Sequence, residues 1–152
     1  MTDDIQFHFK SPNDSPGYLL GQLTLLWQRK QKAILDPLNL TQTQFVLLAA
    51  LAWLSKKSES VTQVDIANQS NADRMMVSKV LRTLEDKGFI NRHQHKTDTR
   101  AKSIRLTDSG SAILQKALVD IENVDLAFFG HLRDKLPDFN SNLRQLIDDN
   151  NT

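Results

Sequence analysis

The chain contains no cysteine among its 152 residues. It therefore has no disulfide framework, no thiolate metal site and no thiol redox sensor. It also lacks a run of about 18 apolar residues, so we expect no transmembrane helix. The first ten residues, MTDDIQFHFK, are acidic and mixed, unlike a secretory signal peptide. We therefore expect a cytoplasmic protein whose length is most simply explained by one domain, residues 1–152, with a substantial core.

Motifs of the common enzyme classes are also missing. The sequence has no glycine-rich phosphate loop, no HExxH and no GxSxG. His93 and His95 would share one face of a strand, but two ligands hold a metal weakly, and zinc requires four partners or three plus water. We predict that the protein is not an enzyme and has no cofactor and no metal site.

Charge is distributed unevenly along the chain, although the net charge is only +1. Residues 71–105 contain nine cations and four anions, a net charge of +5, whereas residues 106–152 have a net charge of −4. The nine cations are Arg74, Lys79, Arg82, Lys87, Arg92, Lys96, Arg100, Lys102 and Arg105. A localised basic patch on a near-neutral chain is typical of a protein that binds the phosphate backbone of a nucleic acid. The alternative is a solvated charged face without a partner.

The basic segment begins with an amphipathic helix and ends with two strand-like runs. Its apolar residues recur at helical spacing, and its cations lie on the opposite face. Gly88 ends the helix, because glycine adopts a left-handed conformation easily. The runs 89–95 and 102–106 follow, joined by a polar loop, residues 96–101. This order predicts a mainly α protein with a small β-hairpin wing, a winged helix-turn-helix. The expected buried stripe of the helix consists of Val77, Val80, Leu81 and Leu84.

Capping residues mark the remaining helices. Ser15 and Pro16 open a first helix that ends at Asp36-Pro37. Capping pairs open the next two helices, Thr107 caps a long one that we expect to reach about Arg133, and Pro137 begins the last. The two pairs are Thr41 with Gln44 and Thr62 with Asp65. On the second helix, the spacing predicts a buried stripe of Phe45, Leu48, Ala49, Ala52 and Trp53.

The first, long and last helices have apolar stripes wider than a small domain can cover. We expect residues 1–37 and 107–152 to form a two-fold dimerisation platform and residues 38–106 a DNA-binding winged-helix lobe. Packing within one chain is the alternative explanation, and it must account for part of the stripe on the first helix.

Five segments together resemble the MarR family of transcriptional regulators. They are LNLTQTQFVLLAAL (38–51), VTQVDIANQ (61–69), LEDKGFINR (84–92), D-x-R at 98–100 and IRLTDSG (104–110). The resemblance spans roughly residues 18–135. It implies a homodimer that binds a pseudo-palindromic operator as double-stranded DNA, most often as a repressor relieved by a small aromatic or lipophilic anion. The recognition helix departs from the family pattern at its start, DRMM (73–76), where small hydroxylated residues are more usual, so the operator sequence is not inferred.

The candidate DNA-binding residues lie on the helix and on the wing. On the helix they are Arg74, Met75, Ser78, Lys79 and Arg82, and on the wing Lys96, Arg100 and Lys102. Cations suit phosphates and guanine edges, and a methionine suits a thymine methyl group. By resemblance, Arg100 enters the minor groove and Asp98 braces the wing loop. For each residue the alternative is an exposed side chain without a role, and for the whole fold it is a winged-helix protein-interaction module.

The resemblance also implies an effector cavity between the dimer platform and the DNA-binding lobe. Trp27, Lys30 and Phe45 could line it. Core or dimer packing explains each of them better, so no effector-binding residue is assigned.

Overall fold

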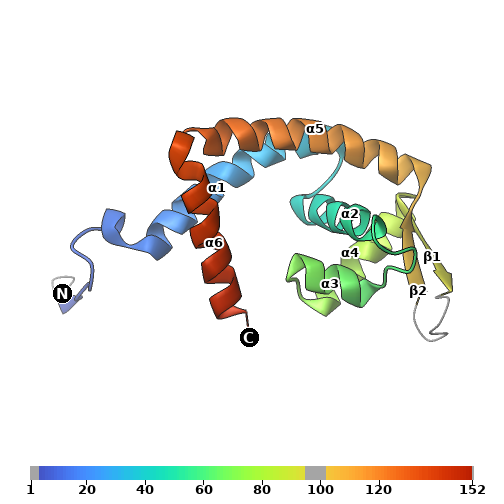
Figure 1. Cartoon of the computed structure of the whole chain (residues 1–152), viewed down its shortest axis with the longest axis horizontal. Coiled ribbons are helices and arrows are strands. Elements are labelled where there is room, and N and C mark those ends of the chain that lie inside the picture. Colours follow the sequence, from blue (N-terminus) through green and yellow to red (C-terminus); the bar gives the residue numbers. More distant parts are fainter. Residues whose placement is uncertain (1–3, 95–101, 152) are drawn as a thin grey trace.

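The computed structural model describes residues 4–94 and 102–151 and confirms a mainly helical chain with one hairpin (Figure 1). The elements are η2 (Pro12–Asp14), α1 (Pro16–Leu35), η3 (Asp36–Leu38), α2 (Gln42–Ser55), α3 (Gln63–Ser70), α4 (Arg74–Asp86), β1 (Ile90–Gln94), β2 (Lys102–Leu106), α5 (Asp108–Gly130), η4 (Arg133–Lys135) and α6 (Leu136–Asn150), where η denotes a 3-10 helix.

The capping signals in the sequence position these helices as predicted. Thr41 Oγ1 accepts from the backbone N–H of Gln44 at 3.0 Å, and Gln44 Oε1 accepts from the N–H of Thr41 at 3.1 Å. Thr62 and Asp65 form the same reciprocal pair at the start of α3. Because each pair satisfies two donors that a helix start leaves unpaired, both helices begin where the sequence indicates.

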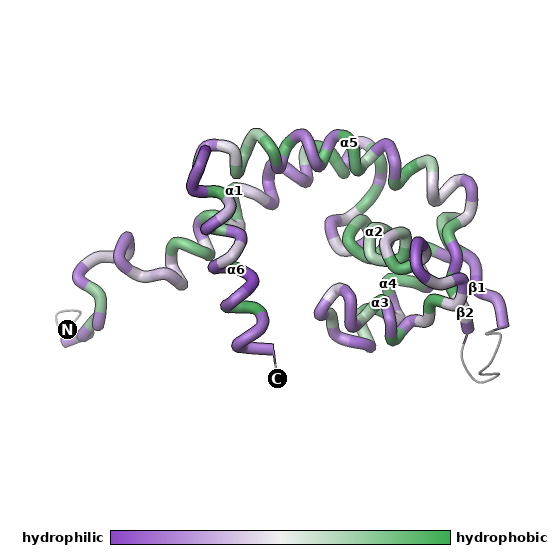
Figure 2. The backbone as a smooth tube through the Cα atoms, viewed as in Figure 1, coloured by the Kyte–Doolittle hydropathy of each residue, from purple (hydrophilic) through white to green (hydrophobic). Residues whose placement is uncertain are grey.

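The chain divides into two halves that α5 joins (Figure 1). The winged-helix lobe consists of α2, α3, α4, β1 and β2. The helical half consists of α1, α5 and α6, with α1 packed along α5. Figure 2 shows hydrophobic residues gathered in α2 and mixed with hydrophilic ones along the helical half. The core therefore lies mainly in the lobe and where the lobe meets α5.

Helix α2 lies at the centre of that core, and its burial differs in part from the prediction. Phe45 and Leu48 are buried as expected, but Trp53 is 51% exposed, whereas Leu47 and Leu51 are almost completely buried. The reason is that α2 packs against α1, α3, α4, α5 and β2. A helix with neighbours on several sides is apolar over most of its surface, so its periodicity does not identify the exposed face.

Within the lobe, the hairpin contacts α2, α3 and α4, and β2 also contacts α5. Strands β1 and β2 pair antiparallel, with Ile90 opposite Leu106, and the N–H of Ile104 donates to the carbonyl of Val61 at 2.7 Å. Gly88 has a φ of +80°, which explains the glycine that ends α4. Gly110, in the first turn of α5, packs so closely against the carbonyl of Phe89 that a Cβ atom would overlap it.

The helical half leaves much of its apolar surface uncovered. Helix α5 ends at Gly130, slightly before the expected Arg133, because Arg133 adopts a left-handed φ of 55°. Helix α6 has no buried residue. Exposed apolar residues of this half are Tyr18, Leu19, Leu20, Leu25, Leu26, Val119, Leu126, Leu146 and Ile147. In the described part of the chain no single helix is long and apolar enough to cross a membrane. One pair of segments, Pro16–Leu38 and Gln42–Ser55, together has the length and composition of a membrane span, but the two are bent by 82° relative to each other.

Candidate nucleic-acid interface

Helix α4 is the element that presents the candidate residues. The Asp73 carboxylate accepts from the N–H of Met76 at 2.9 Å and so caps the start of the helix. Val77, Leu81 and Leu84 are fully buried, with Val80 packed beside them, as the sequence predicted. This apolar face fixes the rotation of α4 about its axis and directs the opposite face outward.

The outward face of α4 is basic, and its cations form no ion pair with another described residue. Arg74, Lys79 and Arg82 are exposed, and among residues 4–94 and 102–151 they form no ion pair. Met75 is 82% exposed. Ser78 is half-buried at the edge of this face. Three unpaired cations around an exposed apolar side chain form a surface suited to phosphates and base edges.

Two of the nine cations in the basic segment are not part of that surface. Arg92 Nε lies 3.4 Å from Glu85 Oε1. Lys87 Nζ donates to the carbonyl of Asn39 at 2.7 Å and to Gln44 Oε1 at 3.1 Å. Both contribute to the net charge of +5 of residues 71–105. Local spacing gives no indication of the Lys87 contacts, because its partners lie more than 40 residues away.

The wing is described only up to its tip. Lys102 and Arg105 are exposed on β2, and Ser103 and Ile104 between them are buried. The predicted site residues Lys96, Asp98 and Arg100 lie outside the described residues. The structure thus brings five candidate residues together on α4, adds Lys102 on the hairpin, and leaves the roles of the wing loop as sequence-based predictions.

Of the two histidines considered as metal ligands, one contacts an asparagine and the other lies outside the described residues. His93 Nε2 lies 2.7 Å from Asn91 Oδ1, and His95 lies outside the described residues. Within residues 4–94 and 102–151 no group of three or more His, Cys, Asp or Glu side chains could hold a metal ion.

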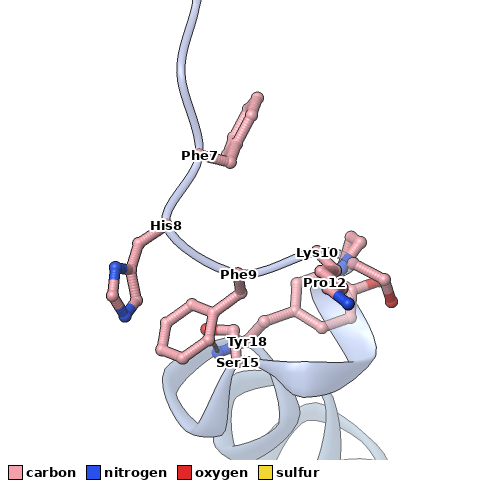
Figure 3. A pocket seen from close by; sticks show the side chains of 8 residues that line it. Phe7, His8, Phe9, Lys10, Pro12, Ser15 and Tyr18 are labelled. Carbon is pink, nitrogen blue, oxygen red and sulfur yellow. Dashed lines mark hydrogen bonds between the residues drawn. The ribbon is translucent and has the colours of Figure 1, made fainter.

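Open cavities lie away from the basic face. One of about 340 Å³ is formed by the N-terminal segment and the start of α1, where Phe9 lies toward Tyr18 and Phe7 projects outward (Figure 3). Another of about 350 Å³ lies where α1 meets α2, between the two halves, and includes Gln28, Leu35 and Gln42.

The three residues considered for an effector cavity have separate positions. Phe45 is buried in the core. Trp27 donates from its indole nitrogen to Asp125 on α5, and Lys30 is exposed on α1. Core packing therefore accounts for Phe45, and the hydrogen bond to α5 accounts for the position of Trp27.

Sequence comparison identifies a winged-helix family. A family model described as "ArnR1-like, winged-helix domain" matches residues 36–125, which include the whole winged-helix lobe and most of α5. The uncharacterised HTH-type transcriptional regulator YdcH of Bacillus subtilis (strain 168) is 42% identical over 139 residues, which cover 91% of this chain and 94% of YdcH.

Structural comparison places the fold among solved regulators. A mutant MarR from E. coli complexed with operator DNA superposes with a TM-score of 0.76 at 21% identity, covering 86% of this chain and 91% of MarR. CouR from Rhodococcus jostii RHA1, bound to p-coumaroyl-CoA, superposes with a TM-score of 0.79 at 20% identity, covering 91% of this chain and 95% of CouR. At these identities the likeness shows a shared fold.

Proposed function

The chain belongs to the ArnR1-like winged-helix family and is a MarR-type transcriptional regulator that binds DNA, and we propose that it does so as a homodimer on a pseudo-palindromic operator. Its family consists of DNA-binding regulators, which are not enzymes. The proposal assigns the recognition helix to α4 and the wing to β1, β2 and the loop between them.

The observation that supports this assignment best is the basic face of α4, whose cations form no ion pair within the described residues. Lys79 and Arg82 are free to contact phosphates or guanine edges, and Met75 can contact a thymine methyl group. Lys102 extends the same positive charge onto the hairpin. By the family pattern, Arg100 enters the minor groove and Asp98 braces the loop that holds it.

The uncovered surface of the helical half supports a homodimer. Helix α6 has no buried residue, although Leu146 and Ile147 lie on it at 62% and 56% exposure. A second copy would cover these side chains and the exposed leucines of α1 through a two-fold interface. Such a dimer presents two α4 helices, which matches an operator with two related half-sites.

Repression relieved by a small aromatic or lipophilic anion is the mode of regulation that we propose. CouR, a structural neighbour, is solved with p-coumaroyl-CoA and, as a transcriptional repressor, with a 23-mer DNA duplex. The cavity where α1 meets α2 borders both halves, so a ligand there would contact the dimer platform and the DNA-binding lobe at once.

Selection of duplexes from a random pool by the full-length protein tests the proposal. We expect enrichment of a two-fold symmetric sequence whose binding weakens with salt. The rival function, a winged-helix module that binds an acidic protein, predicts no enriched sequence. In the same assay, Lys79→Met and Arg82→Met should reduce binding, whereas Lys30→Met, an exposed cation on α1, should not.

A further inference from the structure

Lys87 connects the end of the recognition helix to the junction between α1 and α2. It is the first residue after α4, and its ammonium group donates to the carbonyl of Asn39 at 2.7 Å and to Gln44 Oε1 at 3.1 Å. Asn39 follows η3 in a left-handed conformation, with a φ of 55°. Because an ammonium group is a strong donor, the two contacts fix the end of α4 against this turn.

The partners of Lys87 are themselves held in place. Gln44 is 8% exposed, and its side-chain oxygen also accepts from the N–H of Thr41. In the same turn, Gln42 Nε2 donates to Oε1 of Gln31, a residue of α1 that is only 3% exposed. Hydrogen bonds thus run from α1, in the helical half, through the first turn of α2 to the end of α4.

A second connection joins the end of α4 to the other long helix of the helical half. Thr107, the cap of α5, donates from its hydroxyl group to the carbonyl of Gly88 at 2.6 Å and from its N–H to the carbonyl of Phe89 at 3.0 Å. The end of α4 is therefore held from two sides, by Lys87 toward α1 and by Thr107 toward α5.

We infer that Lys87 is a positioning residue for DNA binding, which sets the placement of α4 relative to the helical half and does not contact phosphate. The inference rests on the proposed homodimer. There, the separation of the two recognition helices depends on how each α4 is attached to the shared platform. Two half-sites one helical turn apart are about 34–36 Å between centres, so a small change in this attachment alters the fit to both. Lys87 thereby contributes to discrimination among half-site spacings.

The test compares two charge-removing substitutions on the same segment. Lys87→Met removes the internal contacts, whereas Lys79→Met removes an exposed cation of the α4 surface, and Lys87→Arg retains both charge and donors. The probe is a duplex that the wild-type protein selects from a random pool, together with versions whose half-sites are one base pair closer or farther apart. Affinity is measured at several salt concentrations, well below the melting temperature of each variant by circular dichroism.

We expect Lys87→Met to weaken binding about 5–20-fold and to reduce discrimination among half-site spacings, while the dependence of affinity on salt stays unchanged. Lys87→Arg should keep most of the wild-type affinity and most of the discrimination among spacings. Lys79→Met should instead reduce the salt slope by about 1 per lost phosphate contact. A salt slope reduced equally by Lys87→Met would show a phosphate contact and overturn the inference, as would unchanged affinity and spacing discrimination. A wild-type protein that selects no duplex overturns the proposed function together with this inference.

Discussion

The indole nitrogen of Trp27 on α1 donates a 2.8 Å hydrogen bond to Oδ1 of Asp125 on α5, across 98 residues of sequence. It is a polar contact between two helices that pack along each other. Because a buried or half-buried indole N–H is costly to leave unpaired, this bond favours one alignment of α1 along α5.

Replacing Trp27 by phenylalanine should therefore destabilise the helical half. We expect Trp27→Phe to lower the free energy of unfolding by about 1–2 kcal/mol, from the lost hydrogen bond and some packing. Trp53→Phe is the matched control, because Trp53 is 51% exposed. Urea unfolding at one fixed protein concentration measures both. Equal effects of the two substitutions would show that the bond to Asp125 does not stabilise the protein.

Close packing of Gly110 against the hairpin gives a second prediction. A Cβ atom there would overlap the carbonyl of Phe89, which also accepts from the N–H of Thr107. Gly110→Ala should cost about 1–3 kcal/mol as an overpacked site, which corresponds to a fall of roughly 2–4 °C in melting temperature per kcal/mol. Gly130→Ala, at a position with open space around it, should be neutral or slightly stabilising. A Gly110→Ala protein that melts like the wild type would contradict the close approach.

The uncovered surface of α6 predicts that this helix takes part in assembly. We expect a dimer at micromolar concentration, and weaker association when the chain is truncated before Leu136. Leu146→Asp with Ile147→Asp should have the same effect, because both side chains are exposed and apolar. Asp148→Asn with Asp149→Asn is the control on the same helix. Analytical ultracentrifugation measures the outcome; a stable wild-type monomer that still binds an operator tightly would contradict the dimer.

Salt dependence tests the electrostatic part of the proposed function. Lys87 and Arg92 are engaged internally, and five of the other cations of residues 71–105 are exposed in the described part of each subunit: Arg74, Lys79, Arg82, Lys102 and Arg105. If the dimer neutralises about 6–10 phosphates, affinity should fall by roughly 10³–10⁵ between 50 and 200 mM salt. Fluorescence anisotropy with a labelled duplex measures this fall. A flat response would favour the protein-contact rival.

Much of the fold could be predicted from the sequence because its signals are local. The capping pair Thr41 and Gln44 and the stripe Val77, Leu81 and Leu84 depend only on neighbours in the same helix, and the structure confirms them. The exposure of Trp53 was predicted wrongly, because it depends on which neighbours surround α2.

In the candidate site, too, the features that depend on local sequence could be predicted, and those that depend on the tertiary fold could not. Exposure of Arg74, Met75, Lys79 and Arg82 follows from the helical period. The internal role of Lys87 depends on Asn39 and Gln44, whose proximity is created by the tertiary fold and has no counterpart in local spacing.

The two DNA-binding elements should differ in what they recognise. Lys79 and Arg82 are exposed on α4, which we propose enters the major groove, where all four base pairs present distinct patterns. The minor groove, where we place Arg100, distinguishes little more than A·T from G·C and reports local width. Substituting a base-contacting residue of α4 should therefore relax preference at particular operator positions, by about 1–3 kcal/mol each.

Arg100→Ala should instead weaken binding to most sequences and reduce any preference for A·T-rich flanks. The folded dimer should persist, because Arg100 lies in a polar loop outside every apolar stripe of the sequence. Asp98→Ala should cause a milder loss of the same kind, since a carboxylate at the DNA would be repelled and its expected role is to brace the loop. Titrations over an operator library, with wild type and both variants, measure affinity and flank preference together. If Arg100→Ala left both unchanged in a folded dimer, the wing would not enter the minor groove, and the recognition helix alone would account for DNA binding.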